Sequence, residues 1–145
     1  MDKTKILLIE DDQVLSKVLY EELSEAGFEV LRAYDGEVGL QLALEKNLDL
    51  ILLDVVLPKK DGFEILEAIK KSPGASGTPV IILTMLGIDE DIKKGLQLGA
   101  DDYIVKSQHA LPEIVEKVKN FFAKEGHGRA KQSSADWHEV PQPDA

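Results

Sequence analysis

The sequence predicts an α/β domain built on a doubly wound, five-stranded parallel sheet with helices on both faces. Five short apolar runs alternate with five segments whose apolar residues recur at helical spacing. Strand–helix alternation of this kind is typical of parallel sheets joined by right-handed crossovers. Several of the runs also end in a charged or polar residue, where open sheets of this class place their ligands. These observations favour the strand order 2-1-3-4-5.

Five segments are predicted to be strands because they are apolar, short and bounded by turn residues. They are Lys5–Ile9, Phe28–Ala33, Leu48–Asp54, Val80–Leu83 and Tyr103–Val105. The third contains the uninterrupted run Ile51-Leu52-Leu53 before Asp54. A run without alternation is typical of a strand that is buried on both faces.

Helices are predicted between these strands from the spacing of apolar residues. The first is ended by Gly27, the second ends near Asn47, the third is ended by a surface loop at Ser72–Gly77, and the last two span Asp89–Leu98 and Leu111–Phe122. The residues expected on their apolar faces are Val14, Leu15, Val18, Leu19, Leu23, Ala26, Val38, Leu40, Leu42, Leu44, Phe63, Ile65, Leu66, Ile69, Ile88, Ile92, Leu96, Leu111, Ile114, Val115, Val118 and Phe122.

The composition of the chain excludes several classes of protein. The chain has 145 residues, no cysteine and a net charge of −10. Disulfides and cysteine–zinc sites are therefore absent, and nonspecific nucleic-acid binding, which depends on Lys and Arg, is disfavoured. No run of about 18 apolar residues predicts a membrane span. Because the start also lacks the apolar core of a signal peptide, we expect a cytoplasmic protein.

Residues 1–124 are expected to form the folded domain and residues 125–145 a flexible C-terminal tail. From Glu125 the sequence is rich in Gly, Ser, Pro and Gln and has no periodic apolar pattern. No output domain is recognisable, so the sequence is compatible with a stand-alone domain, a relay intermediate or a piece of a longer protein.

Polar groups occur where four of the predicted strands end. These groups are Glu10 and Asp11, Asp54, Thr84, and Lys106. In the order 2-1-3-4-5 the ligand crevice lies between strands one and three, which end in the acids. Carboxylates about 4 Å apart repel by roughly 1–4 kcal/mol in a solvated or surface setting. A hard cation such as Mg²⁺, which prefers oxygen ligands, would relieve this repulsion.

Asp54 is the best candidate for a nucleophile in this crevice, because it lies on the middle strand of the set. A carboxylate can attack phosphorus and form an aspartyl-phosphate. The transferred group carries negative charge on its oxygens, which the cation, Lys106 and the hydroxyl of Thr84 can each stabilise.

Four segments together resemble the receiver domain of two-component response regulators, including the receivers of chemotaxis. The segments are Ile6–Asp12, Leu52–Gly62, Leu83-Thr84 and Gly99–Lys106. The second carries a D-x-x-L-P-x-x-D-G pattern directly after a buried strand. The resemblance extends over residues 4–123 and implies a flavodoxin-like fold.

The resemblance implies a phosphorylation switch in a two-component phosphorelay. Asp54 would accept a phosphoryl group from a phosphohistidine on a sensor histidine kinase or a histidine phosphotransfer protein. Asp11 would bind Mg²⁺, or Mn²⁺ in its place, directly; Glu10 would act largely through water, and Val56 would contribute its backbone carbonyl. Thr84 and Tyr103 would then move.

The movement would change the face formed by the fourth helix, the fifth strand and the fifth helix, and a protein partner would read that face. The resemblance implies no direct contact with DNA or a membrane. It implies a monomer, or a weak dimer that depends on phosphorylation.

Four positions differ from the residues that are usual or most informative in this family. Ser107 follows Lys106 where proline is usual, so we expect a trans peptide there, because a non-proline cis bond costs about 2.5–4 kcal/mol. Met85 occupies a position where a small residue is common, and its bulk would narrow access to the site. Val56 and Leu86 are apolar where side chains tune the lifetime of the aspartyl-phosphate, so self-dephosphorylation should be slow.

Other interpretations of these residues remain open from the sequence. The acids could simply cap helices; Asp12 is better explained as a helix N-cap than as a ligand, and Gly62 as a conformationally permissive residue at a helix start. A phosphatase of the haloacid dehalogenase type also uses Asp, Thr or Ser, Lys and Mg²⁺. However, its D-x-D-G-T/S signature is missing after the first strand. A pseudo-receiver that only binds partners is the third alternative.

Overall fold

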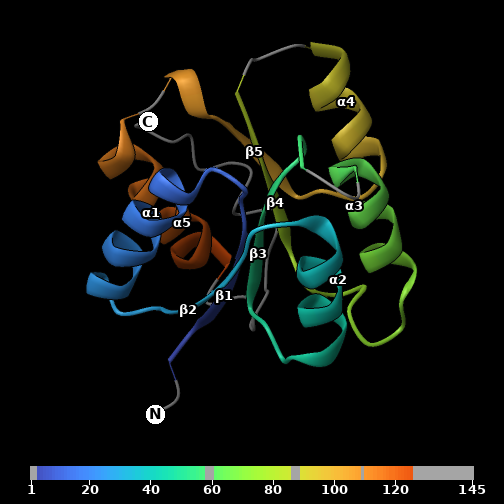
Figure 1. Cartoon of the computed structure of the whole chain (residues 1–145), viewed down its shortest axis with the longest axis horizontal. Coiled ribbons are helices and arrows are strands. Elements are labelled where there is room, and N and C mark those ends of the chain that lie inside the picture. Colours follow the sequence, from blue (N-terminus) through green and yellow to red (C-terminus); the bar gives the residue numbers. More distant parts are fainter. Residues whose placement is uncertain (1–2, 58–60, 86–88, 109, 126–145) are drawn as a thin grey trace.

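A single parallel sheet forms the centre of the molecule, with its strands in the order β2-β1-β3-β4-β5. The computed structural model describes residues 3–57, 61–85, 89–108 and 110–125 (Figure 1). The predicted α/β class and strand order are therefore confirmed. The predicted tail at 125–145 lies almost wholly outside the described residues.

The strands are close to the predicted ones in length and position. They are β1 Lys5–Ile9, β2 Glu29–Ala33, β3 Leu50–Asp54, β4 Val80–Thr84 and β5 Asp102–Val105. The second and third begin later than predicted. Ahead of β3, the Asp49 carboxylate accepts a hydrogen bond from the backbone nitrogen of Lys5 at 2.8 Å, so this residue caps the start of the sheet.

Helices follow each strand and cover both faces of the sheet. They are α1 Gln13–Glu25, α2 Gly36–Glu45, α3 Gly62–Lys71, α4 Asp89–Gln97 and α5 Leu111–Glu125, with a short 3₁₀ turn at Lys106–Gln108. Figure 1 shows α1 and α5 on one side of the sheet and α2, α3 and α4 on the other. The predicted stop at Gly27 has a positive φ, as does Gly99 after α4, and glycine adopts this conformation without strain.

Alternation along the strands builds two separate cores, one on each face. In β1, Ile6 and Leu8 belong to the core under α1 and α5, whereas Leu7 and Ile9 belong to the core under α2 and α3. All five residues of β3 are buried. The strand is therefore covered on both sides, as its unbroken apolar run predicts.

Five residues predicted to lie on apolar helix faces are instead exposed. They are Ala26, directly after α1, and four larger residues with exposed fractions of 75% for Val14, 44% for Val38, 48% for Leu44 and 41% for Leu96. Each helix packs only one stripe against the sheet, so an apolar residue beyond that stripe stays in solvent. Another residue predicted to lie on an apolar helix face, Ile88, lies outside the described residues. In the described part of the chain no helix is both long and apolar enough to span a bilayer.

Candidate functional site

Adjacent strands bring three carboxylates together at the C-terminal edge of the sheet. The register pairs Ile9 of β1 with Leu53 of β3, so the next residues, Glu10 and Asp54, leave the sheet side by side. Both are buried, with 0% and 4% exposed, whereas Asp11 is exposed. One oxygen of each of the three carboxylates lies within 4.8 Å of the others.

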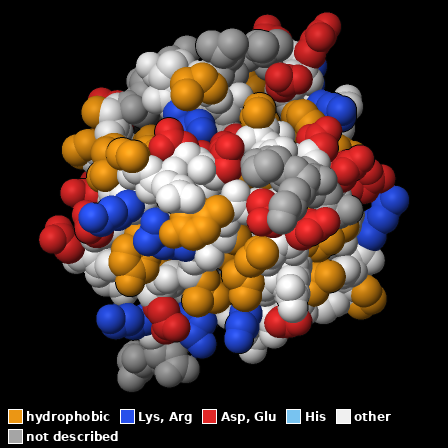
Figure 2. Space-filling view, viewed as in Figure 1, with side chains coloured by type: hydrophobic (Ala, Val, Ile, Leu, Met, Phe, Trp, Pro, Cys, Tyr) orange, Lys and Arg blue, Asp and Glu red, His pale blue; other side chains and the backbone are white. Residues whose placement is uncertain are grey.

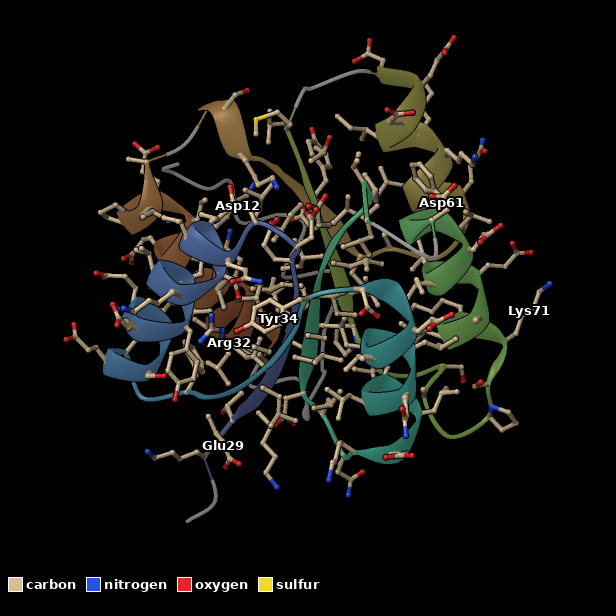
Figure 3. The ribbon with its side chains drawn as sticks, in the orientation of Figure 1. Asp12, Glu29, Arg32, Tyr34, Asp61 and Lys71 are labelled. Atoms are coloured by element: carbon tan, nitrogen blue, oxygen red, sulfur yellow. The ribbon has the colours of Figure 1, made fainter. Side chains whose placement is uncertain are left out.

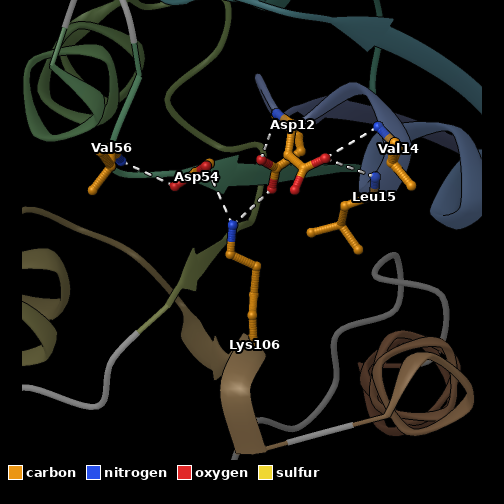
Figure 4. Close-up of polar contacts among 7 residues, drawn as sticks. Asp12, Val14, Leu15, Asp54, Val56 and Lys106 are labelled. Carbon is orange, nitrogen blue, oxygen red and sulfur yellow. Dashed lines mark hydrogen bonds and ion pairs between the residues drawn. The ribbon is translucent and has the colours of Figure 1, made fainter.

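Lys106 places its ammonium group between two of these carboxylates (Figure 4). Its Nζ lies 2.9 Å from Oε1 of Glu10 and 3.3 Å from Oδ2 of Asp54. The lysine side chain is only 9% exposed. Because no cis peptide occurs among the described residues, the bond from Lys106 to Ser107 is trans, as predicted.

Backbone N–H groups fix the other carboxylate oxygens in the same way on both strands. Val56 donates its backbone N–H to Oδ1 of Asp54, and Asp12 donates its own to Oε2 of Glu10, each at 3.0 Å. In both cases the donor lies two residues beyond the acid, as in an Asx-type turn. These hydrogen bonds and the lysine together restrict the orientation of both buried acids.

Two helix N-caps follow the ends of β1 and β3, in the upper half of the molecule in Figure 3. Oδ1 of Asp12 accepts hydrogen bonds from the backbone nitrogens of Val14 and Leu15, both at 3.1 Å. This confirms that Asp12 caps α1 rather than joining the acidic cluster. Asp61 caps α3 in the same manner, accepting from the backbone nitrogen of Phe63 at 2.9 Å.

The charges of the pocket are not balanced. Burial and the nearby charge of Asp54 raise the pKa of Glu10 from 4.5 to about 7. Burial also opposes the charge of Lys106, but its hydrogen bonds to Glu10 and its attraction to both acids outweigh this, so its pKa is raised above 10.5. When Glu10 is ionised, one lysine therefore faces two buried carboxylates, and the pocket has an excess of negative charge.

The remaining predicted residues lie at different distances from this cluster. Thr84 is buried at the end of β4, the strand next to β3. Tyr103 lies in β5, half-buried against the core under α2 and α3, and Lys117 covers its ring. Val56 and Met85, at 73% and 55% exposed, follow the ends of β3 and β4. Leu86 lies outside the described residues.

Gly62 has a role that the sequence did not indicate. A Cβ atom at this position would lie 2.3 Å from Cα of Val55 and 2.7 Å from the carbonyl oxygen of Asp54. The glycine is therefore needed for space: α3 begins directly against the backbone that carries Asp54. The predicted reason, permissive φ and ψ, is wrong, because Gly27 and Gly99 are the glycines with positive φ among the described residues. An Asp-Gly pair soon after a buried strand is the only local signal.

The donor set fits a hard divalent cation. Glu10, Asp11 and Asp54 offer oxygen ligands only, which is the chemistry that Mg²⁺ and Mn²⁺ prefer. Two of the three acids are buried and share one lysine, so a cation would remove the uncompensated charge. The site thus combines a buried carboxylate at a strand end, a lysine and an oxygen-lined cation pocket.

These features define an α/β domain with an acidic pocket at its topological switch point. The sequence model of the response regulator receiver domain matches residues 6–119, and the chain belongs to that family. It is a receiver domain of two-component response regulators.

Individual relatives agree with this assignment. The chain is 41% identical over 132 residues to the transcriptional regulatory protein CpxR of Escherichia coli (strain K12), covering 91% of this chain and 54% of CpxR. It is similar to the CheY-like receiver domain protein of Methanospirillum hungatei JF-1, with a TM-score of 0.79, 28% identity, and coverage of 88% of this chain and 99% of that one. It is also similar to the Mn(2+)-bound form of response regulator Rcp1, with a TM-score of 0.72, 29% identity, and coverage of 82% and 94%.

The chain spans about half the length of the curated relatives it matches. The receiver-domain model matches residues 6–119, which include the acidic pocket.

Proposed function

We propose that this domain is a phosphorylation switch in which Asp54 is the phosphoacceptor. The observation that carries this proposal is the setting of the Asp54 carboxylate. It is buried, it receives a hydrogen bond from the backbone of Val56, and it lies 3.3 Å from the ammonium group of Lys106. A carboxylate held in this way is oriented for attack, and the positive charge lies beside it.

In the proposed step an oxygen of Asp54 attacks the phosphorus of a phosphohistidine on a sensor kinase or a phosphotransfer protein. A P–O bond forms to the aspartate while the P–N bond to the imidazole breaks. The electron pair of the broken bond stays on the imidazole nitrogen, which then takes up a proton. Lys106, and Thr84 at the neighbouring strand end, are proposed to stabilise the phosphoryl oxygens.

A divalent cation, Mg²⁺ or Mn²⁺, is proposed to bind through Asp11, Asp54 and the backbone carbonyl of Val56, with Glu10 acting through water. When bound, it would neutralise negative charge on the phosphoryl group. Glu10 also holds Lys106, at 2.9 Å, and so keeps the ammonium group at the mouth of the site. The related response regulator Rcp1 has an Mn(2+)-bound form, which supports the same kind of ion here.

The surface around the pocket supports a protein as the phosphodonor. Five of the large exposed apolar residues follow strand ends at this edge of the sheet. They are Val14, Tyr34, Val38, Val56 and Met85. Figure 2 shows exposed hydrophobic side chains beside acidic ones on the upper part of one face. Exposed apolar side chains that gather on one part of a surface are typical of a site that contacts another protein.

Phosphorylation is proposed to shift Thr84 and Tyr103 and thereby change the face formed by α4, β5 and α5. A protein partner would read this change, and the domain would be a monomer or a weak phosphorylation-dependent dimer. With a net charge of −10 we expect no direct DNA binding by the domain itself. The domain would act in the cytoplasm and would not turn over phosphate esters.

Intact-mass measurement tests the assignment of the acceptor. The protein is incubated with Mg²⁺ and a small acyl phosphate as donor, and the wild type is compared with Asp54→Asn. Asp61→Asn is the matched control, because Asp61 is another aspartate at the same end of the sheet and asparagine also caps helices.

The wild type and the control should each gain one phosphoryl group, and Asp54→Asn should gain none. Equal labelling of Asp54→Asn would show that the acceptor is another residue. Multiple turnovers of a phosphate ester would instead favour a phosphatase.

A further inference from the structure

Lys117 of α5 makes two separate contacts with Tyr103 of β5. Its Nζ donates a hydrogen bond to the carbonyl oxygen of Tyr103 at 3.4 Å and lies 5.7 Å from the centre of the tyrosine ring. Both side chains are half-buried. One ammonium group therefore contacts the backbone and the ring of the same residue.

Side chains hold both backbone polar groups of Tyr103. Its N–H donates to Oδ1 of Asp102 at 2.8 Å, and its carbonyl accepts from Lys117. With the backbone held at both ends, the ring is the part of this residue that is best able to change orientation, by rotation about χ1.

Tyr103 also lies at a boundary between the two layers of the molecule. β5 is an edge strand, paired with β4. The ring packs against the core under α2 and α3, whereas α5, which carries Lys117, covers the opposite core. Lys117 of α5 thus contacts a ring that packs against the core on the other face of the sheet.

We propose that Lys117 is a positioning residue that sets the orientation of Tyr103. Its cation favours the half-buried ring orientation seen here, and it therefore opposes a further inward turn of that ring. Tyr103 is three residues before Lys106, whose ammonium group contacts the proposed phosphoacceptor. The consequence for signalling rests on the proposed function, because an inward turn matters only if the domain is a switch. The positioning of Tyr103 by Lys117 does not itself depend on the proposed function.

The expected effect is modest, because a cation over a partly exposed aromatic ring contributes a small attraction. Losing it should raise the ratio of inward to outward ring orientations about two- to fivefold. Lys117→Met removes the charge and keeps most of the aliphatic length. Lys117→Arg keeps a cation and should rescue the effect. Lys119→Met is the matched control. Lys119 is exposed and lies two residues after Lys117 in α5, so its side chain projects from a different side of the helix.

Fluorine NMR of protein labelled with 3-fluorotyrosine can follow the ring, because the chain has three tyrosines. Tyr20 and Tyr34 both contact Arg32 of β2, at the opposite edge of the sheet (Figure 3), so they are internal references. A soluble gadolinium chelate reports how exposed each ring is. The measurement uses the full chain, without metal and without phosphodonor.

In Lys117→Met the Tyr103 signal should move and its relaxation by the chelate should fall. Tyr20 and Tyr34 should stay unchanged, Lys117→Arg should resemble the wild type, and Lys119→Met should change nothing. An unmoved Tyr103 signal, or a ring that becomes more exposed, would overturn the proposal. A larger exposure would mean that the lysine only covers the ring.

A second measurement separates this inference from the proposed function. Labelling by a small acyl phosphate in Mg²⁺ should be two- to fivefold faster in Lys117→Met than in Lys119→Met. If the wild type takes up no phosphoryl group, the switch proposal fails. The ring measurement still tests whether Lys117 sets the orientation of Tyr103. If the ring moves but the labelling rates are equal, Lys117 positions Tyr103 without influencing the acceptor, and the regulatory part of the inference is refuted.

Discussion

The imbalance of charge in the acidic pocket predicts an unusual dependence of stability on pH, which Glu10→Gln should remove. In the folded protein without metal, the pKa of Glu10 is raised to about 7 from 4.5. The folded state therefore binds the proton more tightly than the unfolded state between these values. By linkage, the free energy of unfolding falls as pH rises from about 4.5 to about 7.

The magnitude follows from the same two values. At about 1.4 kcal/mol per pH unit, the difference between 4.5 and about 7 amounts to about 3 kcal/mol. The Glu10 side chain is 1% exposed, so screening by solvent reduces this little. Glutamine has the same shape without the ionisable group, and its amide oxygen can still accept from Lys106.

Urea unfolding in a chelating buffer at pH 5, 6, 7 and 8 provides the assay. Other groups titrate in both proteins, so the informative quantity is the free energy of unfolding of the wild type minus that of Glu10→Gln. It should fall by about 2 kcal/mol between pH 5 and 7, because one proton contributes at most about 1.4 kcal/mol per pH unit, and it should level off above pH 7. Mg²⁺ should reduce the fall, because a cation favours the ionised carboxylate. A difference that stays constant from pH 5 to 7 would refute the reasoning.

Three further predictions concern the residues around the acceptor. Gly62→Ala should lower the free energy of unfolding by about 1–3 kcal/mol, because its Cβ would lie 2.3 Å from backbone. Gly74→Ala, with nothing within 4 Å of its Cβ, should have little effect; equal losses in urea unfolding would contradict this. Asp12→Ala should cost about 0.5–2 kcal/mol through loss of the α1 cap, and unchanged thermal unfolding would argue against that cap. Phosphorylated Asp54 should lose its phosphoryl group slowly, since exposed, apolar Val56 cannot orient water; a half-life of seconds by intact mass would refute this.

Much of the fold follows from local patterns. The run Ile51-Leu52-Leu53 predicts a strand covered on both faces, and all five residues of β3 are indeed buried. Strand–helix alternation and crossover handedness then restrict the topology to a few orders. Once that order is chosen, Glu10 and Asp54 must meet, because β1 and β3 are neighbours and their ends share one edge.

Other features could not be predicted because they depend on what packs against a residue. Val14 and Leu15 are adjacent and apolar, yet the first is 75% exposed and the second packs against the core. Ala75, in what the sequence indicates is a surface loop, is 2% exposed. Helical spacing identifies an apolar face, but its width and its angle to the sheet are set by tertiary packing.

The acidic pocket shows most clearly which features follow from the sequence and which depend on tertiary packing. The sequence by itself determined which residues end the strands, and therefore that carboxylates, a hydroxyl and a lysine share one edge of the sheet. Only the tertiary structure decided that Glu10 is buried while its neighbour Asp11 is exposed, and that Lys106 lies between Glu10 and Asp54. The physical reason is the separation along the chain over which each effect acts. Strand alternation is a property of neighbouring residues, whereas desolvation and ion pairing depend on groups as far apart in the chain as residues 10 and 106.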